Sequence, residues 1–360
     1  MLKGKKLASI LAVTAMLTSF GLTGIVEGAS RAELAAIHVN QSGNFRYWNE
    51  NSLAKKKLVA YVQKVTNPKS PDFIPAEHRL AVFDMDGTLL GERTPSYTDG
   101  VFYADRVLHD PNCKVSDEDK KFAQIYWDAI SQRKPVPPEI EKNLYHNLYA
   151  GLAGMTPQSL NAYAQEFMKK PVIGLTNLTY GEAFYLPMVE VISYLEANDF
   201  TCYIVSASDR PLVRALVHGA LQIAPNQIIG SDPQIVASHQ GQISGGSYQM
   251  TQEDTIQYGE LDRVNEKMNK VSSIVREIGM QPVLAFGNSS GDYSMFRYTL
   301  QGNPYKAEVF NVLCDDTQRE YGRPERAEHD KKTSAENGWN TISMKNDWKT
   351  IYGDNVKKTQ

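Results

Sequence analysis

Cysteine is scarce in this chain, which has three such residues among 360. Cys113, Cys202 and Cys314 are an odd number and lie far apart, so a framework of disulfide bonds does not organise the fold. Cys202 and Cys314 lie in the apolar runs TCYIV and VFNVLC, where buried free thiols are expected. An ordinary hydrophobic core must hold the chain together, and its length is sufficient for one.

The chain also lacks an excess of positive charge. It carries 38 Lys and Arg residues against 41 Asp and Glu residues, which gives a formal net charge of -3. This balance gives no electrostatic reason to expect nucleic acid or an anionic membrane as a partner. Internal repeats are absent as well, and 42% of the residues are hydrophobic, so the composition is that of a globular protein.

A long apolar run occurs once, close to the N-terminus. Three lysines precede an uncharged stretch over residues 7–26, and small residues follow it. This arrangement predicts a signal peptide over residues 1–29, cleaved near Ala29 or Ser30. The mature protein would then be exported, to the periplasm, the cell envelope or the medium, without a membrane contact. The run is also long enough to remain as an uncleaved membrane anchor, which is the alternative.

The rest of the chain alternates between short apolar runs and amphipathic helical patterns. The apolar runs are typical of strands buried on both faces of a parallel sheet, and they cover residues 80–83, 200–205, 282–286 and 307–313. Helices are predicted over residues 52–65, 116–133, 137–154, 156–170, 186–198, 209–221 and 261–279. This alternation predicts an α/β fold with a doubly wound parallel sheet.

The long interval between the first two predicted strands indicates an inserted domain. Residues 93–180 are nearly all helical in pattern and too numerous for a simple crossover, so we interpret them as a helical cap. Residues 76–92 and 181–316 would then form the core. A lead-in precedes the core over residues 30–75. A polar tail over residues 317–360 is expected to pack on the core, and no chemistry is assigned to it.

Polar side chains follow three of the predicted strands. Asp84 and Asp86 come directly after the first strand, Ser206 ends the second, and Asn288 and Asp292 follow the third. The carboxyl ends of parallel strands meet at one edge of a sheet, where α/β proteins bind ligands. Carboxylate, hydroxyl and amide oxygens suit a divalent cation that prefers oxygen, such as Mg²⁺, together with a phosphoryl group.

These residue types suit phosphoryl transfer through a covalent intermediate. Asp84, at the end of a rigid strand, is a positioned nucleophile, and Asp86 can act as general acid and then as general base. Gly87 allows a sharp turn that would expose backbone N–H groups to the phosphate. Ser206 and Lys270 would hold the phosphoryl oxygens as negative charge develops.

The chain resembles the haloacid dehalogenase (HAD) superfamily, specifically its phosphoserine-phosphatase-like phosphatases. Four motifs carry the resemblance: DMDGT at 84–88, YIVSAS at 203–208, NKVSSI at 269–274 and GNSSGDYSMF at 287–296. It implies a Rossmann-like core with a C1 helical cap, and Mg²⁺ bound by Asp84, the backbone carbonyl of Asp86, Asp292 and Asn288. Asn288 stands where the family often has Asp, so it is either a ligand or a hydrogen-bonding neighbour of the ligands.

The roles of Glu92 and Lys267 are left open by the sequence. Glu92 either recognises a substrate amine, as an acidic residue near this place does in phosphoserine phosphatases, or is an exposed loop acid. Tyr97 and Tyr103 lie nearby, and an aromatic and acidic pocket there would also suit a quaternary ammonium. Lys267, one turn before Lys270, is the alternative for the phosphate-binding lysine.

Together these observations predict an exported Mg²⁺-dependent phosphomonoesterase that forms an aspartyl-phosphate on Asp84. Its substrate would be a small phosphorylated metabolite, such as phosphoserine or phosphorylcholine. A phosphotransferase or mutase could use the same intermediate. A non-catalytic exported binding protein is the alternative from another class, and Asn288 is the one residue that favours it. A dehalogenase fits poorly, because that reaction needs neither Asp86 nor a metal.

Overall fold

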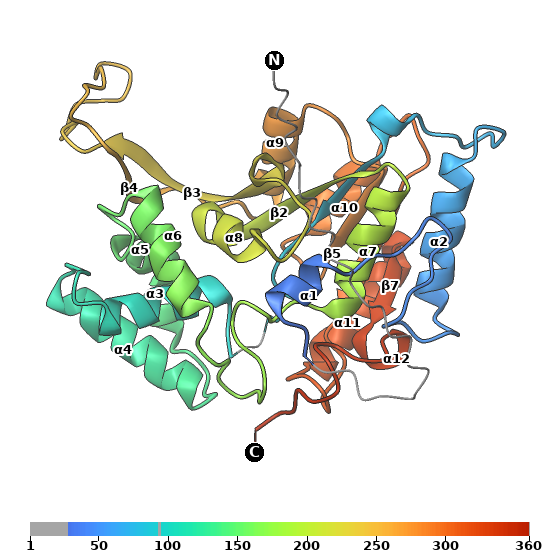
Figure 1. The fold of residues 1–360 in the computed structure, drawn as a ribbon, viewed down its shortest axis with the longest axis horizontal. Helices are drawn as coiled ribbons and strands as arrows, with labels where there is room; N and C mark the ends of the chain where they lie inside the picture. Colours follow the sequence, from blue (N-terminus) through green and yellow to red (C-terminus); the bar gives the residue numbers. More distant parts are fainter. Residues whose placement is uncertain (1–27, 93–94, 360) are drawn as a thin grey trace, which may run out of the picture.

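The computed structural model describes residues 28–92 and 95–359, which fold around a seven-stranded sheet (Figure 1). The strand order is β4-β3-β2-β1-β5-β6-β7, and all neighbours are parallel except β3 and β4. The strands are β1 (Leu80–Phe83), β2 (Thr201–Asp209), β3 (Ile228–Ala237), β4 (Ile256–Arg263), β5 (Leu284–Gly287), β6 (Glu308–Leu313) and β7 (Asn340–Ser343). The predicted doubly wound α/β fold is confirmed. Most of the predicted signal peptide, residues 1–27, lies outside the described residues.

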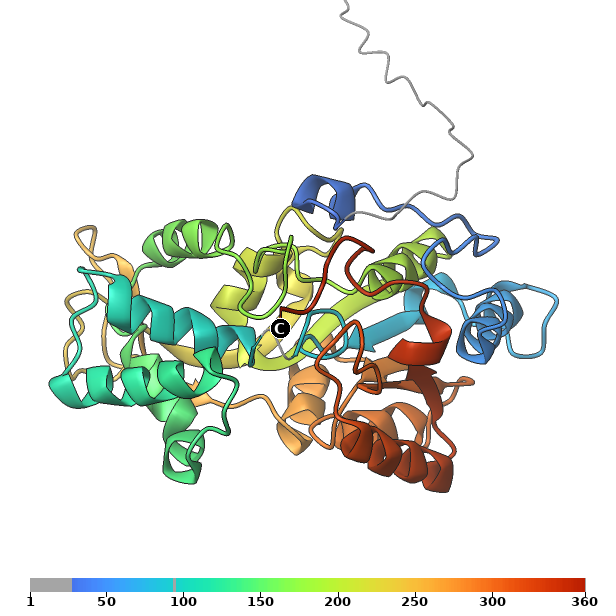
Figure 2. The same ribbon diagram turned by 90° about the horizontal axis from the view of Figure 1, so that it is seen from below.

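Helices cover both faces of this sheet and form a separate group beside it (Figure 2). Those of the lead-in and core are α1 (Arg31–Ala35), α2 (Leu53–Thr66), α7 (Leu186–Ala197), α8 (Arg210–Val217), α9 (Met268–Ser273) and α10 (Tyr293–Leu300). The separate group is α3 (Thr98–His109), α4 (Asp117–Ser131), α5 (Pro138–Ala150) and α6 (Pro157–Phe167). The C-terminal part adds α11 (Pro324–Asn337) and α12 (Met344–Asp347). The separate group falls within the segment that we interpreted as the cap.

The central strands are buried on both faces, as their continuous apolar runs predict. In β1, Ala81 and Phe83 join the larger hydrophobic core, whereas Val82 belongs to a second cluster on the opposite face. Residues of α2 and α7 belong to the larger core, and Met295 and Phe296 of α10 belong to the second cluster. This division follows from the alternation of side chains along a strand. The sheet is packed on both faces, and this packing holds the residues at its carboxyl edge in place.

The sequence analysis did not predict strands β3, β4 and β7, and one predicted helix begins later than expected. The helix predicted over 261–279 begins at Met268, because residues up to Arg263 pair with β3 as the antiparallel strand β4. A π-helical turn continues α9 over Ile274–Ile278. The lead-in has a second helix, α1, which a capping box of Ser30 and Glu33 begins. Partner strands determine β3, β4 and β7, and local sequence does not reveal them.

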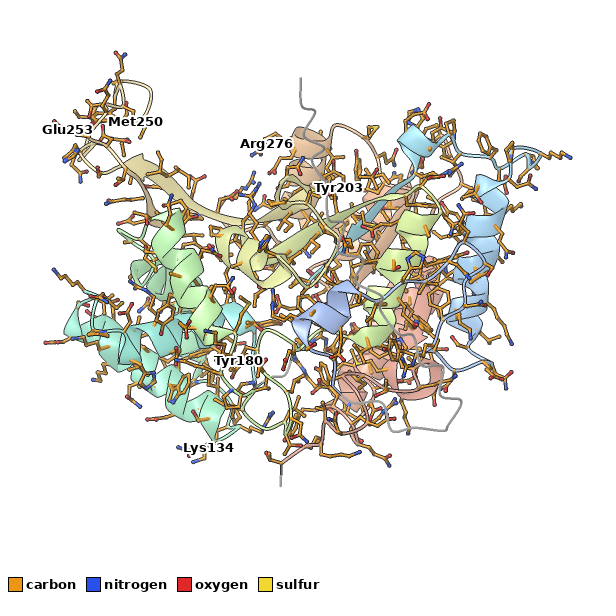
Figure 3. All side chains as sticks on the ribbon, viewed as in Figure 1. Lys134, Tyr180, Tyr203, Met250, Glu253 and Arg276 are labelled. Atoms are coloured by element: carbon orange, nitrogen blue, oxygen red, sulfur yellow. The ribbon has the colours of Figure 1, made fainter. Side chains whose placement is uncertain are left out.

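Strands β3 and β4 form a ribbon that projects beyond the sheet toward the helical group (Figure 1). Met250 and Glu253 lie at its far tip (Figure 3). Along this ribbon, Tyr258 of β4 exchanges two backbone hydrogen bonds with Gly154 and Met155, each of 2.8 Å. The helical group is therefore joined to the core by main-chain bonds as well as by its two connecting segments.

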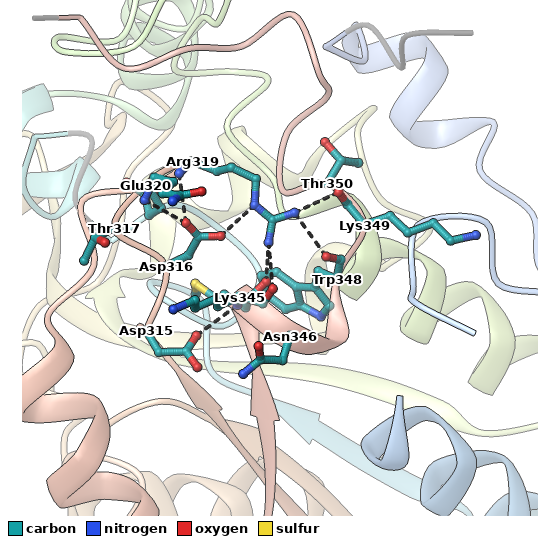
Figure 4. A network of polar contacts seen from close by, with 12 residues as sticks. Asp315, Asp316, Thr317, Arg319, Glu320, Lys345, Asn346, Trp348, Lys349 and Thr350 are labelled. Carbon is teal, nitrogen blue, oxygen red and sulfur yellow. Dashed lines mark hydrogen bonds and ion pairs between the residues drawn. The ribbon is translucent and has the colours of Figure 1, made fainter. Parts of the chain in front are cut away.

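The C-terminal part is folded into the sheet and does not lie on it as a loose tail. Strand β7 pairs with β6 as the edge strand. Arg319 joins the turn after β6 to the chain around α12 (Figure 4). Its Nε donates to Asp316 Oδ2 at 2.6 Å, and its other nitrogens donate to the carbonyls of Lys349 at 2.7 Å and Met344 at 2.6 Å. This part of the chain is thus placed to contribute to the site.

The three cysteines are buried and unpaired, as predicted for Cys202 and Cys314. Within the described ranges, every helix is too short or too polar to span a bilayer.

Candidate active site

The residues after β1 form a tight turn at the carboxyl edge of the sheet. The carbonyl of Met85 accepts the N–H groups of Thr88, Leu89 and Leu90 at 2.8–3.2 Å. Gly87 has φ +79°, and a Cβ atom there would collide with the side chain of Asn288. The Gly87 N–H itself donates to the Leu90 carbonyl at 2.7 Å. Gly87 therefore shapes the turn, and its own N–H is not available to a phosphate.

Asp84 is buried at the end of β1, and a buried ammonium group lies against it. Lys270 of α9 donates to Asp84 Oδ1 at 2.5 Å and to Asp292 Oδ1 at 2.7 Å. Lys267 is exposed and pairs with Glu266 at 3.3 Å, so the structure brings Lys270 and not Lys267 into the site. Asn265 fixes α9 against β2, because its Nδ2 donates to the Ser206 carbonyl and its Oδ1 accepts from Ser273.

Asp292, predicted as a metal ligand, is buried and lines the same cavity as Asp84 and Asp86. One carboxylate oxygen accepts a hydrogen bond from Lys270 Nζ, and the other accepts hydrogen bonds from the backbone N–H groups of Asn288 and Ser289 at 3.0 and 3.1 Å. Asp292 therefore anchors Lys270 and the turn after β5, and its place as a magnesium ligand stays a prediction.

Asp86 is held by a serine that the sequence analysis did not assign to the site. Ser208 Oγ donates to Asp86 Oδ2 at 2.6 Å, while Asp86 Oδ1 is buried with no hydrogen-bond partner among the described residues. Ser206 is fully buried, and its Oγ accepts the N–H of Ser208 at 3.0 Å. Asp209 Oδ1 caps α8 by accepting the N–H of Leu212. The two serines are two positions apart on β2, and this spacing is the sequence signal that could have indicated Ser208.

The two aspartates share a crowded acidic environment. Burial raises the pKa of Asp84 to about 7; Asp292 adds to this rise, and Lys270 opposes it. Burial also raises the pKa of Asp86 to about 7, with a further contribution from the carboxyl group of Asp99 on α3. For Lys270, burial lowers the pKa, but the carboxylates of Asp292 and Asp84 more than offset this and raise it. A carboxyl group whose pKa is near 7 can both donate and accept a proton at neutral pH.

Glu92 is buried, so the interpretation as an exposed loop acid is wrong. Its Oε1 accepts from Arg326 Nη1 at 2.7 Å, from Arg323 Nη2 at 3.0 Å and from Tyr97 OH at 3.2 Å. Both arginines come from the start of α11, in the segment to which the sequence analysis assigned no chemistry. No motif marks them, and they lie more than 200 positions from Glu92, so no local signal could have identified the pair.

These side chains open on one cavity of about 590 Å³. Its floor contains Asp84, Asp86, Lys270, Asn288 and Ser208, and Ala207 rather than Ser206 completes the contribution of β2. The walls come from α3, α4 and α5 and from the segment before α11, and include Tyr97, Tyr126, Ile130, Val136, Leu144 and Arg323. A cavity of this size is typical of sites for small molecules.

A comparison with protein families agrees with this geometry. The family model of the haloacid dehalogenase-like hydrolases matches residues 81–297, which is more than half of the chain. The chain belongs to this family. The matched segment contains every residue assigned to the site above except Arg323 and Arg326, so the family resemblance predicted from the four motifs is confirmed.

Several solved structures are similar to this HAD chain. A conserved protein of unknown function from Anaerococcus prevotii DSM 20548 has 14% identity and a TM-score of 0.52, with 85% of this chain and 94% of that chain covered. A protein of unknown function from Bordetella pertussis Tohama I has 17% identity and a TM-score of 0.43, with 74% and 98% covered. A phosphoserine phosphohydrolase-like protein from Francisella tularensis has 12% identity and a TM-score of 0.37, with 73% and 94% covered. A search of curated proteins gives no match.

The HAD site of this chain contains a mixed set of oxygen atoms that fits a small cation. The Asn288 carboxamide lies 3.2 Å from Asp84 Oδ2 and 3.2 Å from the Asp86 carbonyl oxygen. If the amide nitrogen of Asn288 faces these two oxygens, it donates a hydrogen bond to each of them. If the amide oxygen faces them instead, three oxygen atoms converge, as they do around Mg²⁺. Across residues 28–92 and 95–359, no group of three or more His, Cys, Asp or Glu side chains forms a metal site. The mixed set is therefore the candidate.

Proposed function

We propose that this chain is an exported, Mg²⁺-dependent phosphomonoesterase that works through an aspartyl-phosphate. The observation that carries the proposal is the arrangement at the end of β1. Asp84 is buried beside Lys270 at 2.5 Å, Asp86 follows two residues later, and both line one cavity of about 590 Å³. Membership of the HAD hydrolases supports the same reaction class.

The first step transfers the phosphoryl group to the protein. A carboxylate oxygen of Asp84 attacks phosphorus, and the bond from phosphorus to the leaving oxygen breaks. Asp86 gives its proton to that oxygen, so the alcohol leaves uncharged. Ser208 already donates to Asp86 Oδ2, which leaves Oδ1 as the oxygen that can carry the proton into the cavity. Lys270 compensates the charge that Asp84 and the phosphate bring together.

The second step returns the enzyme to its starting state. Asp86, now a carboxylate, accepts a proton from a water molecule as that water attacks phosphorus. The bond between phosphorus and Asp84 breaks, and inorganic phosphate leaves. Asp84, the Asp86 carbonyl and Asn288 would hold Mg²⁺, which supplies positive charge beside the phosphoryl oxygens when bound.

The proposed activity is tested with p-nitrophenyl phosphate and Mg²⁺. We expect phosphate release that EDTA abolishes and that Asp84→Asn lowers by at least about a thousandfold, since that variant lacks the nucleophile. Asp262→Asn, at an exposed position on β4, is the matched control and should retain full activity. No turnover of a broad panel of phosphomonoesters would refute the enzyme and favour a binding protein. Preferential capture of the phosphoryl group by added alcohols would replace the hydrolase with a transferase.

Export is a separate part of the proposal and rests on the N-terminal sequence. Three lysines, the uncharged stretch over residues 7–26 and the small residues after it are the features that support it. N-terminal sequencing of the protein recovered from the envelope or the medium should begin near Ala29 or Ser30. A full-length chain that fractionates with membranes would instead support the uncleaved anchor.

A further inference from the structure

Glu92 has little negative charge left to offer a substrate amine. Its Oε1 accepts from two guanidinium groups and one phenol, at 2.7, 3.0 and 3.2 Å. Two cationic side chains therefore face one buried carboxylate. A substrate ammonium at Glu92 would have to approach past Arg323, which lines the same cavity. Repulsion between the guanidinium group of Arg323 and a positive charge on the substrate therefore opposes a cationic leaving group.

The two arginines differ in how completely their hydrogen-bond donors are used. Arg326 donates to Glu92 through Nη1 and to the Asn288 carbonyl through Nη2, and its Nε lies 3.4 Å from Asp330 Oδ2. All three of its nitrogens are engaged, so Arg326 fixes the start of α11 against the site. Within the part of the chain that the structure describes, Arg323 donates a side-chain hydrogen bond only through Nη2, to Glu92. Its Nε is buried with no hydrogen-bond partner among the described residues.

Arg323 therefore lines the cavity that holds Asp84, Asp86 and Lys270, and its Nε–H has no partner among the described residues. A buried donor without a partner is unfavourable, and a ligand that supplies an acceptor removes that cost. The planar guanidinium group matches the paired oxygens of a carboxylate or a phosphate. The bond from Nη2 to Glu92 holds the guanidinium group in place before a ligand arrives.

We infer that Arg323 forms a second anion subsite, and that the substrates are phosphomonoesters whose alcohol half carries a carboxylate or a second phosphate. The inference rests on the proposed function, whose site supplies the first phosphate position. It separates the two substrates named above, because phosphoserine carries a carboxylate and phosphorylcholine carries only a cation. It also assigns a role to the C-terminal segment, which reaches the cavity at Arg323.

The test measures binding, so that it does not depend on turnover. Three phosphonates are titrated calorimetrically into the full chain with Mg²⁺: 3-phosphonopropanoate, propylphosphonate and 2-aminoethylphosphonate. The first two differ in the carboxylate alone, and the third replaces it with an ammonium. We expect the carboxylate compound to bind at least about tenfold more tightly than propylphosphonate, a factor that corresponds to about 1.4 kcal/mol. The ammonium compound should bind most weakly.

Two variants and one control assign the effect to the residue. Arg323→Gln should reduce the tenfold preference to less than about threefold, and Arg323→Lys, which keeps the charge without the planar fork, should be intermediate. Arg276→Gln is the control, because Arg276 is exposed on the turn after α9, away from the cavity (Figure 3). Circular dichroism verifies that each variant is folded; if Arg323→Gln is not, Arg323→Lys and the wild-type comparison still decide.

Three results would overturn the inference. The first is an equal affinity of the wild-type chain for the carboxylate and propyl compounds, and the second is a preference that Arg323→Gln leaves unchanged. The third is tightest binding of 2-aminoethylphosphonate, which would restore Glu92 as an amine receptor. The phosphonates cannot be hydrolysed, so failure of the p-nitrophenyl phosphate assay would refute the proposed function without deciding this one.

Discussion

Removal of the Lys270 ammonium group should destabilise the fold strongly. The group is 1% exposed and bonds to Asp84 at 2.5 Å and to Asp292 at 2.7 Å. In Lys270→Met both carboxylates stay buried, and Asp84 loses the charged partner that compensates its burial. Breaking a buried ion pair by removing one partner costs about 3–5 kcal/mol. The whole stability of a domain is about 5–15 kcal/mol, so the loss should be easy to measure.

The assay is guanidinium unfolding in EDTA, so that no divalent cation replaces the lost charge. Lys267→Met is the matched control, because Lys267 is exposed and pairs only with Glu266 at 3.3 Å. An exposed pair of this kind contributes about 0–1 kcal/mol, so this variant should unfold at nearly the wild-type denaturant concentration. A clear difference between the two variants would show that burial and not charge alone sets the cost.

A triple variant tests the physical cause of the loss. Adding Asp84→Asn and Asp292→Asn to Lys270→Met removes the uncompensated charges, so at least half of the lost stability should return. The reasoning would be refuted if Lys270→Met costs less than about 1 kcal/mol. It would also be refuted if the triple variant is as unstable as the sum of the single changes, because the three side chains would then act independently.

Three further perturbations follow from the structure. Asn288→Asp adds a second carboxylate to the cation site and should tighten Mg²⁺ binding about tenfold by calorimetry; unchanged affinity would place residue 288 outside the ligand set. Arg319→Ala removes the bonds to Asp316 and to carbonyls around α12 (Figure 4) and should cost about 3 kcal/mol in guanidinium unfolding, whereas a loss below about 1 kcal/mol would contradict this. Burial raises the pKa of Glu196 from 4.5 to about 7. Between these two pH values the folded state holds a proton on Glu196 that the unfolded state has lost, so the free energy of unfolding falls as pH rises from 4.5 to about 7. Glu196→Gln should therefore raise the melting temperature at pH 8 but not at pH 5, and an equal gain at both would refute the shift.

The parts of the fold that the sequence predicted are those encoded by neighbouring residues. Ser52 and Ser116 accept the N–H groups that begin α2 and α4, and both helices start at the expected positions. The runs that became β1, β2, β5 and β6 are continuous and apolar, because parallel strands are buried on both faces. Asp84 and Asp86 follow the first of them, and the rule that ligands bind at the carboxyl edge then places both in the site.

The missed strands depend on partners that are distant in sequence. In β3, Asp232 and Pro233 resemble a turn, and a prolyl residue donates no ladder hydrogen bond. The segment nevertheless pairs with β2 on one side and β4 on the other, with register shifts beside these two residues. An irregular strand of this kind is stabilised by the sheet it joins, so its own residues carry a weak signal.

Glu92 shows why the electrostatics of the site were harder to predict than its nucleophile. A sequence displays a carboxylate without its neighbours, so the two natural interpretations were contact with water and contact with a substrate amine. The actual partners lie 231 and 234 positions later, on a polar segment with no motif. They pair with the carboxylate that was expected to meet a cation, and the Nε–H of Arg323 has no partner among the described residues. A chemical step can be encoded in five residues of a turn, whereas the charge that a substrate meets depends on which distant segments the fold brings to the cavity.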